Sequence, residues 1–207
     1  MLISEKACTW GINCVNWPDL WPARPEVSVA AHHDGDNLYL HYKVKEDSVL
    51  AVAAADREPV WKDSCVEFFF APGDDGLYYN IECSCIGKIY MCCGRDRNDR
   101  EFLPESAYVG IIREGSLGSE PFGLREGPQE WEMQLVIPAS TFGLKSFCGL
   151  EARGNFYKCG DGLPRRHYLS LFPIGTPKPD FHRPEFFDKI IFSKRQKISC
   201  RRFGKDF

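Results

Sequence analysis

The sequence predicts an all-β protein, an antiparallel β-sandwich with long loops. Apolar and polar residues alternate with a period of two in most segments, which is the pattern of half-buried strands. Turn-forming Gly, Pro, Asp or Asn bounds each of these segments, as expected for a sandwich. The 207 residues, 43% of them hydrophobic, suffice for one core. We therefore expect a single domain over 1–207, with its core at about 8–193 and a basic tail at 194–207.

The clearest element is a hairpin over residues 26–44. Val27 and Val29 alternate with small or polar residues, and Leu38 and Leu40 alternate on the return strand. The tetrapeptide DGDN between them supplies the turn. The HHDGDN stretch could also ligate a metal, but the turn explains the same residues, and we favour it. Further strands are predicted at 48–55, 64–72, 77–87, 88–94, 107–114, 130–138, 150–160 and 186–193.

Three other segments differ from this pattern. PASTFG at 138–143 is a proline-started helical turn that a glycine closes. Composition also predicts two long loops. Residues 94–106 are highly charged, and residues 160–185 combine prolines, aromatics and histidines. Loops of this length within a compact domain are usually functional. The second loop has the composition of a rigid binding rim.

The segment VWKDSCVEFFFAP at 60–72 places a carboxylate inside an apolar strand. Successive strand residues point to opposite faces, so Val66, Phe68 and Phe70 share one face and Glu67 lies on the other. The first face is wholly apolar and should meet the core. Glu67 should then lie on the opposite surface of the sheet.

The next strand offers this carboxylate polar neighbours. If the strand at 77–87 pairs with the strand at 64–72, Asn80 and Glu82 lie beside Glu67. Asn155 belongs to a similar mixed set in the strand at 150–160. Carboxylates and amides beside an aromatic ring suit a sugar, which presents hydroxyls and an apolar ring face. A solvated outer face of an antiparallel sheet would explain the same pattern.

Charge and composition exclude several classes of protein. The formal net charge of -3 gives no broad basic field for nucleic acid, and the basic tail is most simply a solvated extension. No apolar run is long enough to span a membrane, and the N-terminus lacks a signal-peptide pattern. As it stands the chain is expected to be cytoplasmic, or exported if a leader was removed. The ten cysteines lack zinc-finger spacing, so we interpret most as reduced core residues.

Several segments together resemble the family 9 carbohydrate-binding modules, in their DOMON-like branch from gut Bacteroides-type bacteria. They are VWKDSCVEFFFAP, YYNIECSCIGKIY, GNFYKCGD, HYLSLFPIGTPKPDFHRPEFF and DKIIFS. The resemblance covers about residues 8–193 and implies a DOMON-like, jelly-roll-like β-sandwich that binds glycan ends without catalysis. It implies glycan-degrading enzymes as partners and no cofactor, with calcium a minor expectation.

The resemblance assigns roles residue by residue. Trp61 matches a stacking tryptophan and Glu67 matches a sugar-binding glutamate. The second stacking tryptophan of related sequences has no counterpart near Leu171: either Phe172 is a smaller platform in its place, or the second wall is missing. The full set of predicted ligand-binding residues is Trp61, Glu67, Asn80, Glu82, Lys88, Asn155, Phe172 and His182.

Three other functions stay open on the sequence. Glu67 and Glu82 could be the acid and nucleophile of a glycoside hydrolase. The proline-rich 160–185 loop could dock a protein. A DOMON-like haem site would need an axial ligand from Met91, His167 or His182.

Overall fold

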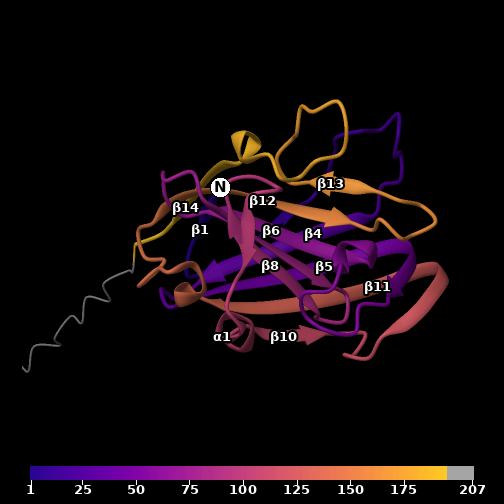
Figure 1. The fold of residues 1–207 in the computed structure, drawn as a ribbon, viewed down its shortest axis with the longest axis horizontal. Coiled ribbons are helices and arrows are strands. Elements are labelled where there is room, and N and C mark those ends of the chain that lie inside the picture. Colours follow the sequence, from indigo (N-terminus) through magenta and orange to yellow (C-terminus); the bar gives the residue numbers. More distant parts are fainter. Residues whose placement is uncertain (195–207) are drawn as a thin grey trace, which may run out of the picture.

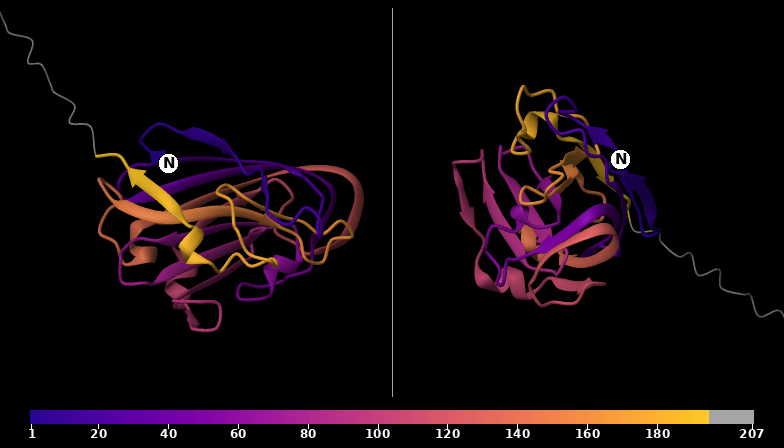
Figure 2. Two further views of the ribbon diagram at one scale, coloured as in Figure 1. Left: turned by 90° about the horizontal axis from the view of Figure 1, so that it is seen from above. Right: turned by 90° about the vertical axis from the view of Figure 1, so that its right-hand side faces the viewer.

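The computed structural model describes residues 1–194, and the regular secondary structure of these residues is almost entirely strands in two packed sheets (Figure 1). The predicted all-β sandwich is confirmed. The basic tail lies outside the described residues, apart from Lys194. Figure 2 shows the two layers from the end and the first and last strands at one edge, where β1 pairs with β14 in parallel. The other strand pairs are antiparallel.

The larger sheet has nine strands. Its path runs β1 (Leu2–Ile3), β14 (Asp188–Phe192), β12 (Glu151–Cys159), β6 (Cys65–Ala71), β7 (Tyr78–Ser84), β8 (Ile89–Gly94) and β9 (Arg100–Phe102). β13 (Tyr168–Ser170) pairs with β12 and with β3 (Cys14–Val15).

The smaller sheet has five strands, in the order β10 (Ile112–Gly115), β11 (Phe122–Pro138), β5 (Asn37–Ala51), β4 (Glu26–His33) and β2 (Cys8–Gly11). The helical elements are short: η1 (Val60–Lys62), α1 (Glu105–Val109), η2 (Ala139–Phe142) and η3 (Pro184–Phe186).

The main core lies between the sheets and follows strand alternation. Val66, Phe68 and Phe70 of β6 all belong to it, as the sequence predicts. Phe68 stacks on Phe156 of β12 with ring centroids 4.6 Å apart. These aromatic side chains fill the inner face of the larger sheet, so the intervening side chains of β6 must point outward.

The outward face of β6 is covered rather than solvated. A second apolar cluster contains Cys65 and Phe69 of β6 together with Tyr157, Phe181 and Trp17. Trp17 Nε1 donates to the Thr176 carbonyl (2.6 Å), which ties the N-terminal loop to the loop after β13. Figure 1 shows these two loops, indigo and orange-yellow, side by side beyond β13. The 160–185 loop therefore buries its apolar residues against its own sheet.

Several boundaries differ from the sequence prediction. The return strand of the first hairpin continues into the predicted strand at 48–55, which gives one strand, β5, that ends at Ala51. The strand predicted at 107–114 begins only at Ile112, because residues 105–109 form the helix α1 after Pro104, whose backbone is extended (φ -61°, ψ 153°). The turn predicted at 138–143 is confirmed as η2, which ends at Gly143 with a positive φ of 68°.

The turn predicted in the first hairpin is also confirmed. The 34–37 segment is a hairpin turn, in which Asp34 Oδ1 accepts the backbone N–H groups of Asp36 (2.9 Å) and Asn37 (2.7 Å). All nine cysteines in the described residues are free thiols. Within residues 1–194, no helix is long and apolar enough to cross a membrane.

Candidate functional site

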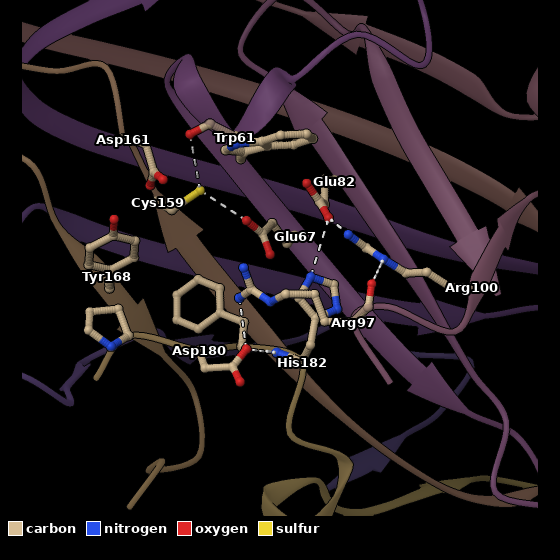
Figure 3. A pocket seen from close by; sticks show the side chains of 12 residues that line it. Trp61, Glu67, Glu82, Arg97, Arg100, Cys159, Asp161, Tyr168, Asp180 and His182 are labelled. Carbon is tan, nitrogen blue, oxygen red and sulfur yellow. Dashed lines mark hydrogen bonds and ion pairs between the residues drawn. The ribbon is translucent and has the colours of Figure 1, made fainter. Parts of the chain in front are cut away.

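A pocket opens where the covering loops meet the outward face of the larger sheet (Figure 3). Its cavity volume of about 160 Å³ is small beside the roughly 300–1,000 Å³ that is usual for small-molecule sites, so it suits a ligand group no larger than one compact ring. Its lining combines acidic, basic and aromatic side chains: Trp61, Glu67, Glu82, Arg97, Arg100, Cys159, Asp161, Tyr168, Pro179, Asp180, Phe181 and His182.

Two buried carboxylates form the floor of this pocket. Glu67 of β6 and Glu82 of β7 are direct partners in the antiparallel register, and each is 3% exposed. Burial, followed by the negative charge of Glu82, raises the pKa of Glu67 well above its usual range. Burial also raises the pKa of Glu82 to about 7, although the nearby Arg100 opposes that rise. Two like charges this close cannot both ionise easily without a cation between them.

The two carboxylates differ in their partners. Glu82 Oε1 accepts from Asn80 Nδ2 (3.0 Å) and lies 3.7 Å from Arg100 Nη1. Glu67 Oε1 accepts from the Cys159 thiol (2.9 Å), and no other side-chain donor within the described chain reaches its carboxylate. Glu67 therefore has hydrogen-bonding capacity to offer a ligand.

Trp61 forms one wall and is positioned by its backbone. It is the central residue of η1, and its half-buried ring meets Tyr90 edge-on at 5.0 Å. Its carbonyl accepts the N–H of Asp161 (3.0 Å), and the Lys62 carbonyl accepts that of Gly162 (2.9 Å). A Cβ on Gly162 would lie 2.6 Å from the Lys62 oxygen, so this close approach requires glycine.

Asp63 fixes the other side of η1. Its fully buried carboxylate accepts the N–H groups of Val52 (2.9 Å) and Ala53 (3.0 Å), which follow β5. We predict that Asp63→Ala lowers the free energy of unfolding by about 2 kcal/mol, because one buried and one partly buried backbone donor lose their acceptor. Urea denaturation measures this loss, with the exposed Asp74→Ala as the control. A change under about 0.5 kcal/mol would contradict this role.

The opposite wall is also aromatic. Phe181 stacks on Tyr157 with centroids 4.2 Å apart and planes 15° apart. Tyr168 meets Phe181 edge-on at 5.9 Å, and Trp17 contacts both rings from outside the pocket. Figure 3 shows Trp61 and Tyr168 on different sides of Glu67.

Basic residues line the edge near β9. Arg100 Nη1 donates to Asn80 Oδ1 (3.0 Å), and Arg97 Nη2 donates to Asp180 Oδ1 (2.7 Å). His182 Nε2 lies 4.0 Å from Glu82, but burial and the two arginines lower the pKa of this imidazole to about 2. The histidine is therefore neutral at physiological pH.

The structure brings together half of the predicted ligand-binding residues. Trp61, Glu67, Glu82 and His182 line the pocket, and Asn80 lies directly behind it. The remaining three predicted residues, which are Lys88, Asn155 and Phe172, do not line it.

These three have structural surroundings of their own. Lys88 lies in the turn between β7 and β8, where its N–H donates to Ser84 Oγ (3.1 Å). Asn155 is fully buried and uses its amide to hold Phe172: its Nδ2 donates to the Phe172 carbonyl (2.9 Å), and its Oδ1 accepts the Phe172 N–H (3.0 Å). Tyr168 and Phe181 occupy the wall that the sequence assigns to Phe172.

Sequence reasoning assigned no binding role to eight of the lining residues. Cys159 ends β12, and the other seven come from the two long segments predicted as loops: Arg97 and Arg100 from 94–106, and Asp161, Tyr168, Pro179, Asp180 and Phe181 from 160–185. The length of both loops was a signal of function. It could not select individual residues, since which of them face the pocket depends on how the loops fold back.

One compact group of potential metal ligands is present in the described residues. The ligand atoms of Cys65, Glu67 and Cys159 lie within 4.8 Å of one another. Two thiols suit a soft metal such as zinc, whereas calcium prefers oxygen ligands. This group therefore does not fit the calcium that the resemblance implies.

The three candidate haem ligands lie in different surroundings. Met91 is part of the main core, and His182 lines the pocket. His167 is buried beside Lys158, whose Nζ lies 2.8 Å from its Nε2. They do not form one axial site.

Comparison with known proteins identifies the family. Residues 1–192 match the model of carbohydrate-binding family 9. A solved structure from Bacteroides uniformis ATCC 8492, provisionally designated a carbohydrate-binding protein, is 43% identical, with a TM-score of 0.87 over 90% of this chain and 86% of that one.

Two more distant structures share the fold. Both are family 9 modules from Caldicellulosiruptor kristjanssonii. The complex with cellotriose is 12% identical, with a TM-score of 0.60 over 96% of each chain. The complex with glucose is 13% identical, with a TM-score of 0.57 over 96% of this chain and 98% of that one. No curated protein matches the sequence. With the match over residues 1–192, the chain belongs to carbohydrate-binding family 9.

Proposed function

We propose that this protein binds a sugar, at the end of a glycan or free, in the pocket between Trp61 and the Tyr168–Phe181 wall, and that it does so without catalysis. The observation that carries the proposal is a buried carboxylate pair at the floor of a pocket with aromatic rings on two sides. Membership of carbohydrate-binding family 9 supports it.

Each part of the pocket suits one feature of a pyranose. The Trp61 ring offers an apolar surface to the axial C–H groups of the sugar. The free oxygens of Glu67 and Glu82 accept hydrogen bonds from its hydroxyls, and Arg100 can donate to a ring or hydroxyl oxygen. Because the floor is closed, the pocket suits one terminal residue better than the middle of a long chain.

The same geometry argues against a glycoside hydrolase. Such enzymes place their two carboxyl groups on either side of the scissile bond. Glu67 and Glu82 are cross-strand neighbours on one sheet face, so both would approach a sugar from the same side. This arrangement favours hydroxyl recognition over acid and nucleophile catalysis.

Replacing Trp61 tests the proposal. We expect Trp61→Ala to weaken the binding of glucose or cello-oligosaccharides at least about tenfold, because the stacking surface is lost. Isothermal titration calorimetry measures it, with the half-buried Trp10→Ala on the other sheet as the matched control. An unchanged affinity in Trp61→Ala would contradict sugar stacking, and turnover on a glycan panel would overturn the non-catalytic function.

A wider role follows from this proposal. A module that recognises sugars without cleaving them would serve glycan-degrading enzymes during polysaccharide use. Fractionation of cells grown on the bound glycan would show whether the protein shares a compartment with those enzymes.

A further inference from the structure

The pocket contains more acidic than basic groups. His182 is neutral, for the reason given above, so the charges come from carboxylates and guanidinium groups alone. Four carboxylates and two guanidinium groups line the pocket: Glu67, Glu82, Asp161 and Asp180, with Arg97 and Arg100. The lining thus has two more carboxylates than cations.

The distribution of ion pairs places this excess at the floor. Arg97 pairs with Asp180 near the mouth (2.7 Å), and Arg100 is the cation nearest Glu82 (3.7 Å). Within the described chain, no basic side chain lies within 4.0 Å of Glu67, although this residue is only 3% exposed. Its one hydrogen-bond partner is the neutral Cys159 thiol. A buried carboxylate without a cation is costly in its ionised form, so it either holds a proton or needs a ligand that supplies positive charge.

We propose that the pocket prefers an amino sugar, a pyranose that carries a protonated primary amine, with the ammonium group against Glu67 and Glu82. This inference rests on the proposed function, since it assigns the class of sugar that the same site binds. An ammonium group supplies three N–H donors and a positive charge, whereas a hydroxyl supplies one donor and no charge. Hydrogen bonds from a charged donor to a carboxylate are about twice as strong as neutral ones.

Proton release is a second consequence of this arrangement. Burial raises the pKa of both glutamates, to about 7 for Glu82, and the negative charge of Glu82 adds to the rise at Glu67, so near neutral pH the pair holds protons. An ammonium group between the two carboxylates favours their ionised forms and displaces those protons to the buffer. A neutral sugar has no such effect.

Titration calorimetry near pH 7 with four monosaccharides tests the inference. We expect D-glucosamine to bind at least about tenfold more tightly than D-glucose. N-acetyl-D-glucosamine, which keeps the nitrogen but loses its charge, should show no such gain, and the anionic D-glucuronate should bind more weakly than D-glucose. The heat of glucosamine binding should change with the ionisation enthalpy of the buffer, and that of glucose should not.

Substitution of Glu67 at the pocket floor separates the effect of its charge on sugar preference from the effect of its side-chain shape. Glu67→Gln keeps the size of the side chain and should reduce the preference for glucosamine over glucose at least about fivefold. The exposed Glu114→Gln of β10, on the other sheet, should leave the preference unchanged.

The outcomes distinguish the two proposals. Equal or tighter binding of glucose or glucuronate, weakened by Trp61→Ala, would overturn the amino-sugar preference and leave sugar binding intact. Failure of all four sugars and of longer glycans to bind would overturn the proposed function itself.

Discussion

Replacing Lys158 with methionine is expected to lower the free energy of unfolding by about 4 kcal/mol, because one charge of a buried ion pair is left alone. Lys158 of β12 is fully buried, and its Nζ lies 2.9 Å from Glu46 Oε2 of β5. This contact is at ion-pair distance but lacks hydrogen-bond geometry. The Nζ donates instead to the Cys159 carbonyl (2.8 Å). Glu46 Oε1 accepts from Trp131 Nε1 of β11 (2.7 Å), so the pair joins the two sheets.

A double variant isolates the charge from the packing. Glu46→Gln combined with Lys158→Met removes both charges and keeps an acceptor for Trp131, so it should recover at least half of the lost stability. Urea denaturation of the wild type, both single variants and the double variant completes the cycle. A loss under about 1 kcal/mol in Lys158→Met would contradict the buried pair as a major stabilising contact.

The second large effect is the pH dependence that Glu82 contributes to stability. Its pKa in the folded protein is about 7, above the ordinary 4.5. A raised folded pKa means that the stabilising contribution is complete below about pH 4.5 and is lost as the pH rises through 7. The difference corresponds to about 3 kcal/mol. Glu82→Gln removes this titration, so relative to wild type the variant should gain about that amount between pH 4.5 and 7.5.

Comparison with the variant is needed because buried histidines act in the opposite direction. Burial lowers the pKa of His167 and of His182 in the folded protein. Below about pH 6.5 the unfolded chain protonates these histidines and the folded protein does not, so the free energy of unfolding falls as the pH falls. Both histidines are present in both proteins, and their contribution largely cancels in the difference. Denaturant unfolding at several pH values gives that difference. A flat difference, or a gain by wild type on raising the pH, would contradict the raised pKa of Glu82.

Residues 64–72 show how much of the site could be predicted. The separation of Phe68 from Glu67 onto opposite faces needs only the period of a strand, which is a local property. The pairing of Glu67 with Glu82 needs only that consecutive strands form a hairpin, and the structure confirms it. Trp61 reaches the same pocket because η1 leads directly into β6.

Lys88, Asn155 and Phe172 show where such reasoning stops. Lys88 was chosen by strand position, but it lies in the turn after β7, away from the pocket. Asn155 is on the correct strand, yet its amide is used by the Phe172 backbone. Neither outcome is visible in a periodic pattern: the first depends on where β7 ends and its turn begins, and the second on a contact between residues 17 apart in the chain.

The sequence by itself determined the all-β class, the two faces of β6 and the polar neighbours of Glu67 on β7, because strand alternation and turn residues encode these features locally. Only the tertiary structure decided that the outer face is covered. The 160–185 loop folds back, buries Phe181 and His182 over Glu67 and Glu82, and so turns a polar sheet surface into a pocket. Tertiary packing also places Arg97 and Arg100, from the 94–106 segment, at the edge of that pocket. Burial and charge balance arise from long-range packing, and they set both the raised pKa values and the chemistry that the pocket can recognise.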